Sequence, residues 1–209
     1  MMYEQFKTRA EGVSAEVCRF ATKDAALAWL IEFLHKEGVA ETPQTTALWA
    51  ECSFLDGMDR NALKRVAGLK FEVTRELASE ARFGISQMQW ALADTGTLVQ
   101  DSTAIEQRLV SSLSTIHIAI APTSGILPDM PTLLTRIHPS GPVTQDKCVN
   151  EVISDRKNAE NNISRTNSGY IAMITGASRT ADIERVLTIG VHGPERLIII
   201  FCDELGGVN

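Results

Sequence analysis

The sequence predicts a single α/β domain with a mainly parallel, Rossmann-like sheet flanked by helices. Segments with strand periodicity and segments with helix periodicity alternate along the chain, which favours α/β layers. With 209 residues, of which 44% are hydrophobic, the chain can bury one substantial core, because a single domain commonly reaches about 200 residues. We therefore expect one domain over residues 1–209, in which residues up to about 40 form an N-terminal helix and strand extension packed on the core.

The expected helices follow from apolar spacing and from start and stop signals. The clearest helix covers residues 24–36, where leucine and isoleucine residues recur on one face and Gly38 follows the end. Ser86 and Gln89 have the spacing of a capping box, which predicts a helix over residues 87–93. Further helices are expected over residues 2–10, 59–67, 105–113 and 131–136, and a solvated helix within residues 145–168.

The expected strands are short apolar or alternating runs. Residues 116–121 form a continuous apolar run that Pro122 ends, which is typical of a buried strand. The final part of the chain indicates a β-α-β unit with a strand at 170–174, a helix at 181–189 and a strand at 196–202. Other strands are expected over residues 15–21, 46–50 and 69–74, and at 98–99.

The turn before the expected helix at 181–189 carries the groups of an anion site. Gly176 permits a left-handed or closely packed backbone, while Ser178 and Thr180 supply hydroxyl groups. Arg179 can pair bidentately with a carboxylate or phosphate. In a right-handed β-α-β unit this loop, which begins at Thr175, faces the ligand crevice of the sheet. The same residues also suit a helix cap with Thr180 as the N-cap, so both interpretations stay open.

Three further residues are candidates for contact with a ligand at this loop. Glu184 falls in the first turn of the expected helix, where the helix dipole favours a carboxylate and a structural role. His192 lies between that helix and the next strand, at the edge of the sheet opposite Ser178, where a tight turn with a hydrogen-bonded histidine is favoured. Asp203 emerges at the carboxyl end of its strand, near Ser178, and is the better-placed candidate for ligand contact.

A second loop, Thr95, Gly96 and Thr97, joins the expected helix at 87–93 to the strand at 98–99. On physical grounds it is a turn, because glycine is common after a helix and threonine is common in strands. Its backbone N–H groups could also bind an anion, if the strand that it opens runs antiparallel to its neighbours. His35, His117 and His138 are scattered in the sequence, and core or surface positions are favoured over metal binding.

Composition excludes several function classes. A net charge of −6 argues against a nucleic-acid partner, because binding phosphates needs clustered basic residues. The cysteines stand far apart, without spacing for zinc or iron–sulfur ligation, and are Cys18, Cys52, Cys148 and Cys202. No secretory signal and no apolar run of about 18 residues is evident, so we expect a cytoplasmic protein without a membrane span. Dinucleotide, P-loop, zincin and hydrolase-elbow motifs are missing.

Three motifs together carry a family resemblance. They are residues 91–99 (ALADTGTLV), residues 175–184 (TGASRTADIE) and residues 190–194 (GVHGP). This set resembles the lactate-utilisation protein C family, which is built on the LUD domain, and the similarity extends from Phe6 to Asp203. The common form of the family has proline where this chain has Ala177, a change that relaxes the loop without removing a functional group.

The resemblance implies a fold and a metabolic role with partner proteins. The fold would be NagB/RpiA/CoA-transferase-like, shared with ribose-5-phosphate isomerases, glucosamine-phosphate deaminases, CoA transferases and methenyltetrahydrofolate synthetases, so a phosphate, nucleotide or carboxylate ligand is expected. The family is linked to the oxidation of L-lactate to pyruvate with two partner proteins, one cysteine-rich and one carrying iron–sulfur clusters. The resemblance thus implies an accessory subunit that binds no cofactor itself, with the clusters on its partners.

Two functions from different classes stay open. The first is the accessory subunit of a lactate-oxidising complex, which the resemblance favours. The second is a free-standing CoA-transferase-like or isomerase-like enzyme that binds a phosphorylated, nucleotide or acyl ligand at the loop of Ser178, Arg179 and Thr180. Whether the chain is itself an enzyme is left open. A small anionic ligand is expected in both cases, and a homodimer is the most common assembly.

Overall fold

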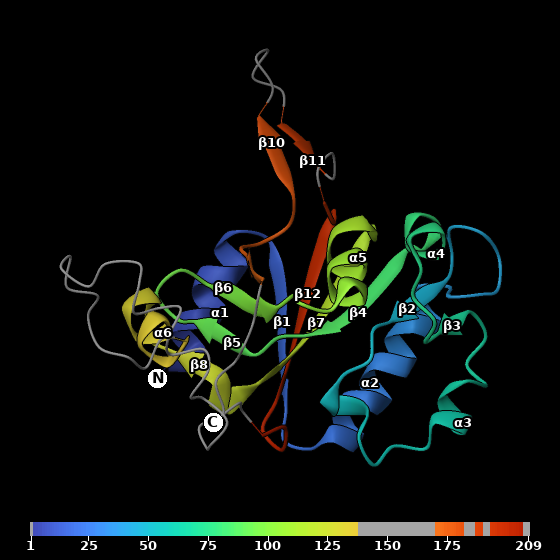
Figure 1. The fold of residues 1–209 in the computed structure, drawn as a ribbon, viewed down its shortest axis with the longest axis horizontal. Helices are drawn as coiled ribbons and strands as arrows, with labels where there is room; N and C mark the ends of the chain where they lie inside the picture. The colour runs from blue at the N-terminus through green and yellow to red at the C-terminus, as the bar shows by residue number, and fades with distance from the viewer. Residues whose placement is uncertain (1, 138–169, 182–186, 190–192, 207–209) are drawn as a thin grey trace, which may run out of the picture.

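A parallel sheet of six strands forms the centre of the molecule. The computed structural model describes residues 2–137, 170–181, 187–189 and 193–206 (Figure 1). The strand order is β1-β12-β7-β4-β2-β3, and every neighbouring pair is parallel. The strands are β1 (Ala15–Phe20), β2 (Ala47–Trp49), β3 (Leu69–Lys70), β4 (Phe83–Gln87), β7 (Ile116–Pro122) and β12 (Arg196–Cys202). The predicted α/β class with a mainly parallel sheet is confirmed.

The order of these strands contains a reversal. From β2 the chain moves to β3 on one side, and then crosses back to β4 on the other side of β2. From β4 it continues in the same direction to β7 and β12. In an open parallel sheet such a reversal leaves a crevice at the carboxyl ends of the two strands between which it occurs. The sheet therefore has a topological switch point between β2 and β4.

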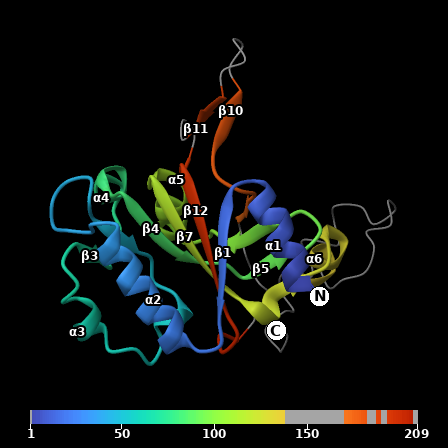
Figure 2. The same ribbon diagram turned by 180° about the vertical axis from the view of Figure 1, so that it is seen from behind.

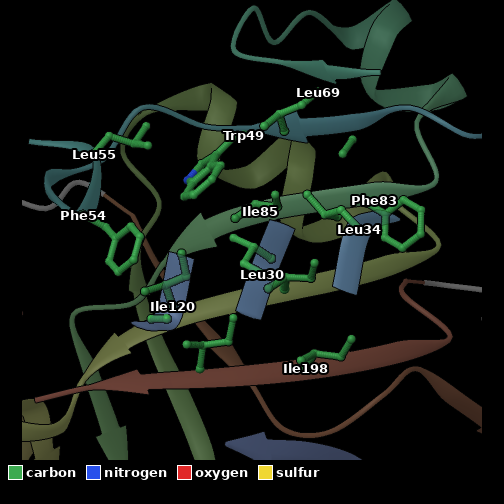
Figure 3. Close-up of a cluster of buried hydrophobic side chains, with 14 of the residues drawn as sticks. Leu30, Leu34, Trp49, Phe54, Leu55, Leu69, Phe83, Ile85, Ile120 and Ile198 are labelled. Carbon is green, nitrogen blue, oxygen red and sulfur yellow. The ribbon is translucent and has the colours of Figure 1, made fainter. Parts of the chain in front are cut away.

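One face of the sheet is covered by α2 (Lys23–Lys36), α3 (Arg60–Leu63) and the short helix η1 (Ser53–Leu55). Figure 3 shows Leu30 and Leu34 of α2 directed toward Ile85 of β4 and Ile198 of β12. All four side chains are fully or almost fully buried. Helix α2 begins where predicted, and the side chain of Thr22 caps it by accepting from the backbone N of Ala25 at 3.2 Å.

Two groups of elements pack on the opposite face of the central sheet. Helices α4 (Arg75–Glu80) and α5 (Ile105–Leu113) pack on β2 and β4. A second sheet and α1 (Met2–Gly12) pack on β7 and β12, and Figure 2 shows α1 beside β1. The order of this sheet is β8-β5-β6-β9, from β8 (Ile126–Leu127), β5 (Trp90–Leu92), β6 (Thr97–Asp101) and β9 (Ile171–Ile174). Helix α6 (Met130–Ile137) covers its outer side through Leu133.

The predicted β-α-β unit at the end of the chain is wrong. Residues Arg179–Ala181 (β10) and Leu187–Ile189 (β11) form an antiparallel hairpin that extends away from both sheets, as Figure 1 shows. Threonine and isoleucine favour strands, and two of the three residues of β11 are of these types. In addition, β9 and β12 belong to different sheets, whereas a β-α-β unit joins two strands of one sheet.

The predicted helix over residues 87–93 is also wrong, because this region contains the end of β4 and all of β5. Both members of the supposed capping box bind other strands. The Ser86 hydroxyl lies 2.8 Å from Nε2 of His117 in β7. Oε1 of Gln89 accepts a hydrogen bond from the backbone N of Asp101 in β6. Contacts between strands have thus replaced the local cap.

Other elements agree with the sequence or differ in length. The helices at 24–36, 105–113 and 131–136 and the strands at 116–121 and 196–202 are confirmed. Helix α3 and strand β3 are shorter than the predicted 59–67 and 69–74, and α4, capped by Thr74, was not predicted. The helix expected within 145–168 lies outside the described residues. None of the helices in the described part of the chain has the length and hydropathy needed to cross a bilayer.

Candidate functional site

The structure brings two of the predicted loops together. Thr97 begins β6 and Thr175 follows β9, and these strands pair in antiparallel fashion. The two threonine hydroxyl oxygens lie 2.8 Å apart. Since β6 is antiparallel to both neighbours, the condition set for the loop at Thr95 is met. The loop of Thr95 to Thr97 and the loop that starts at Thr175 therefore lie side by side.

Glycines in both loops pack against the end of α1. Gly96 has a φ of +70°, and a Cβ atom there would lie 2.5 Å from the backbone N of Ala10. Gly176 has a φ of +71°, and a Cβ atom there would lie 2.4 Å from the carbonyl oxygen of Val13. Only glycine tolerates both the left-handed backbone and so close an approach. Packing against α1 thus explains why both motifs contain glycine.

The third motif meets this region as well. The backbone N of Ser178 donates to the carbonyl oxygen of Pro194 at 2.8 Å. Gly193 and Pro194, which follow His192, therefore do not lie at the opposite edge of the sheet from Ser178, as the expected β-α-β unit would have placed them. Arg179 and Thr180 lie on β10 instead of at a helix start. Glu184 and His192 fall outside the described residues.

Asp203 lies at the other end of β12 from this loop cluster. Its carboxylate pairs with Arg19 through two hydrogen bonds of 2.8 and 3.0 Å, and this pairing lowers the pKa of Asp203. Ser178 lies beside Pro194, just before β12 begins, whereas Asp203 follows its last residue. At about 3.3 Å per residue, the seven residues of β12 separate them by about 20 Å. The expectation that Asp203 lies near Ser178 is wrong.

A groove of about 500 Å³ opens at the topological switch point. Its walls come from the segment after β2, from the end of β4 and the residues after it, from the end of β6 and from the start of α5. The lining residues are Glu51, Cys52, Ser53, Gln87, Gln89, Asp101, Thr103, Ala104 and Gln107. Small-molecule sites in proteins commonly have volumes of about 300–1,000 Å³ and lie at this position in open parallel sheets.

A buried polar network supports one wall of the groove. Nε2 of Gln107 donates to the carbonyl oxygen of Glu51 at 2.8 Å, and its Oε1 accepts from Gln100 at 3.2 Å. Gln100 also donates to the hydroxyl of Ser86 at 2.9 Å, and Ser86 is bonded to His117. Buried networks whose members are bonded to one another are rigid. The side chain of Gln107 is thereby fixed between α5 and the segment after β2.

His117, the innermost member, is fully buried, in line with the core position expected for it. Burial lowers its pKa to about 4, so the imidazole is neutral at physiological pH. Its Nδ1 has no hydrogen-bond partner among the described residues. Nor do the described residues contain a group of three His, Cys, Asp or Glu side chains that could hold a metal ion.

The ionisable groups at the groove differ in charge and in protonation. Arg60 forms a bidentate ion pair with Glu51 and lowers the pKa of this carboxyl group, so its charge is compensated. Burial raises the pKa of the Cys52 thiol, which keeps the thiol protonated at neutral pH. Outside the lining, Nζ of Lys23 donates to the carbonyl oxygen of Ser53 at 3.3 Å and adds a positive charge next to this wall.

Sequence analysis missed this groove. It includes Asp101 at the end of β6, whereas the loop cluster of Thr97 and Thr175 lies at the start of the same strand. The five residues of β6 place the two regions about 13 Å apart. A signal was present, since Glu51 and Gln87 are polar residues at the ends of apolar strands, where ligands of parallel sheets bind. Without the strand order, however, nothing showed that these two strands are neighbours.

Comparison with known proteins identifies the family. The model of the LUD domain matches residues 3–202, almost the whole chain. The chain belongs to the LUD domain family. The LUD chain is also similar in fold, with a TM-score of 0.57 and 16% identity over 96% of both chains, to a crystal structure of a DUF162 family protein from Deinococcus radiodurans.

Curated relatives of this LUD chain carry a shared name. A protein of Exiguobacterium sp. named lactate utilization protein C is 29% identical over 98% of this chain and 79% of its own length. A protein of the same name from Bacillus subtilis is 36% identical over 65% of this chain. The match spans 48% of the Bacillus subtilis protein, about half its length. The resemblance to the lactate-utilisation protein C family is confirmed.

Proposed function

We propose that this LUD chain acts in L-lactate utilisation as an accessory subunit, in a cytoplasmic system that oxidises lactate to pyruvate. In this role it binds a small anionic ligand, while a cysteine-rich protein and an iron–sulfur protein carry the electrons. The observation that carries the proposal is the groove at the switch point of a chain whose relatives are named lactate utilization protein C. The groove supplies a place for a ligand, and the relatives supply the biological context.

The arrangement of the cysteines is consistent with this division of labour. Cys18 lies on β1, Cys202 ends β12 and Cys52 follows β2. They therefore come from separate strands, whereas cluster-binding proteins draw their ligands from closely spaced cysteine motifs. The proposal assigns the redox groups to the partner proteins for this reason.

The alternative is a free-standing enzyme of the CoA-transferase-like class, which was suggested by the loop of Ser178, Arg179 and Thr180. That loop was expected to open a helix, whose N-terminus would help to bind an anion. The backbone N of Ser178 is bonded to Pro194, and Arg179 begins a strand. We therefore favour the accessory subunit.

Reconstitution tests the proposal. The chain would be purified alone and together with the iron–sulfur and cysteine-rich lactate-utilisation proteins of its own organism. L-lactate-dependent reduction of a dye would then be measured. We expect dye reduction in the mixture that contains all the proteins, and its loss when this chain is omitted. The proposal is wrong if the purified chain binds neither partner and converts a substrate alone.

Light scattering on the same samples would test the proposed homodimer.

A further inference from the structure

The groove has hydrogen-bond donors on one wall, and Gln89 is the first of them. Its Oε1 accepts from the backbone N of Asp101, which fixes the orientation of the amide. Its Nε2 therefore points away from that backbone and has no hydrogen-bond acceptor within the described part of the chain. Gln89 is half-buried and lines the groove. It thus presents an oriented N–H donor pair to a ligand.

Gln87 is oriented in the same way. Its Oε1 accepts from the backbone N of Phe54 at 2.8 Å, and its Nε2 donates to the hydroxyl of Ser53 at 2.9 Å. An amide nitrogen carries two hydrogens, so one remains for a ligand. Gln87 is 8% exposed, and the hydrogen bonds of its side chain hold it in place. Two amide side chains held by hydrogen bonds therefore line the same groove, and each has an N–H group that no acceptor among the described residues takes.

An acceptor is present in the lining as well. Oδ1 of Asp101 accepts from the backbone N of Thr103 at 3.0 Å. A carboxylate has about four lone-pair sites on its two oxygens, so it can accept several hydrogen bonds at once. The groove thus combines amide donors with a carboxylate that can accept from a hydroxyl group. This combination matches a ligand that carries both an anionic oxygen pair and a hydroxyl.

The charges around the groove permit an anion. Glu51 is neutralised by Arg60, and the ammonium group of Lys23 lies next to Ser53. Helix α5 begins at the groove with Ala104 as its N-cap, a residue whose side chain makes no capping hydrogen bond. The partial positive charge of a helix N-terminus adds to the attraction for a carboxylate. These groups offset the negative charge of Asp101.

We infer that the groove binds a small 2-hydroxy carboxylate, with the carboxylate on the amide nitrogens of Gln87 and Gln89 and the hydroxyl on Asp101. The inference rests on the proposed function for its choice of L-lactate as the probe, and on the groove itself for the chemistry. The volume of about 500 Å³ leaves room for a longer hydroxy acid of the same class.

Ligand-observed NMR titration of the purified chain would measure the affinity for three compounds. L-lactate carries both groups, acetate lacks the hydroxyl and L-lactamide lacks the carboxylate. We expect L-lactate to bind more tightly than either of the others. Equal binding of all three, or no binding of L-lactate, would overturn the inference.

Gln89→Glu is the most direct variant. Glutamate keeps an oxygen to accept from Asp101 N, and it replaces the amide nitrogen with a charged oxygen that repels a carboxylate. We expect L-lactate binding to weaken by about tenfold or more. Gln5→Glu, on the exposed surface of α1, adds the same charge away from the groove and should bind as the wild type does. Wild-type affinity in Gln89→Glu would contradict the inference.

Asp101→Asn provides a second readout that does not depend on Gln89. Asparagine retains an oxygen for the backbone N of Thr103 but accepts fewer hydrogen bonds from a ligand. We expect the preference for L-lactate over acetate to fall, and an unchanged preference would remove Asp101 from the site.

The proposed function and the proposed ligand of the groove can fail independently of each other. If Gln89→Glu supports full dye reduction with the partners, the groove assignment fails and the function stands. If L-lactate binds but no dye is reduced, the function fails and the groove stands.

Discussion

The hydroxyl oxygens of Thr97 and Thr175 lie 2.8 Å apart across 78 positions of sequence, and they join the start of β6 to the residue after β9. Thr97 is 6% exposed, whereas Thr175 is exposed. This bond closes one end of the second sheet, where two family motifs meet. It links these motifs through the framework of the fold, away from the groove at the other end of β6.

Thr97→Val should therefore reduce the free energy of unfolding by about 1 kcal/mol, the usual net value of a hydrogen bond between neutral groups. Valine has a similar shape and keeps the preference for strands. Urea unfolding of Thr97→Val, Thr175→Val and the double variant would measure the coupling. We expect the double variant to lose less than the sum of the single variants. Strict additivity would show that the two hydroxyls do not act together.

Gly176→Ala should lower the free energy of unfolding more than Thr97→Val does. Its Cβ atom would lie 2.4 Å from the carbonyl oxygen of Val13, in a left-handed backbone conformation. We expect a loss of about 2 kcal/mol or more in the free energy of unfolding, since strain and overlap add together. Gly206→Ala serves as the control, because a Cβ atom there meets nothing within 4 Å. Equal stability of the two variants would rule out close packing of Gly176 against the end of α1.

His117 predicts a pH dependence of stability. Its pKa is about 4 in the folded protein, against about 6.5 in an unfolded chain. Between these values the unfolded chain binds more protons, so the free energy of unfolding should fall as the pH is lowered from about 6.5 to 4. The contribution is about 3 kcal/mol. It is fully present above the unfolded value and lost by the time the folded histidine protonates.

Urea unfolding at a series of pH values would measure this contribution. His117→Gln should show a weaker decline than the wild type over the same range. His35→Gln removes an exposed histidine of α2 and should decline as the wild type does. If the decline in His117→Gln matches that of the wild type, the burial of a neutral His117 does not govern this pH range.

Asp203→Asn should leave ligand binding intact. The carboxylate pairs with Arg19 on a partly exposed surface, where such pairs contribute about 0–1 kcal/mol. Because this pairing lowers the pKa of Asp203, its stabilisation is present at neutral pH and is lost as the pH falls through the folded pKa. Thermal unfolding and L-lactate titration would both be measured. A large loss of L-lactate affinity would place Asp203 in the site after all.

Local patterns predicted much of the framework. The apolar stripe of α2 and the continuous apolar runs of β7 and β12 depend on neighbours within one element, and these elements lie where expected. Ser86 and Gln89 misled the prediction because their side chains bond to residues far away in sequence, His117 and Asp101. A capping box and a pair of contacts between strands use the same residue types, and only the tertiary fold separates them.

The groove was harder to predict. Its lining comes from segments after β2 and β4, from the end of β6 and from α5, and only the order of strands brings these segments together. The sequence motifs drew attention to Gly96 and Gly176 instead, whose backbone conformation and close contacts with α1 explain their presence. Gln87 and Gln89 were not recognised as residues of a ligand site, because the helix predicted over residues 87–93 contained both of them.

Mapping the L-lactate site by backbone amide NMR would test most directly whether the groove is the functional site. Signals of the wild-type chain would be followed as L-lactate is added. We expect the largest shifts at Gln87, Gln89 and the residues from Asp101 to Gln107, with little change at the Thr97 and Thr175 loop cluster. Shifts confined to Thr175, Ser178 and Arg179, about 13 Å or more from the groove, would contradict the groove and restore the loop as the binding site.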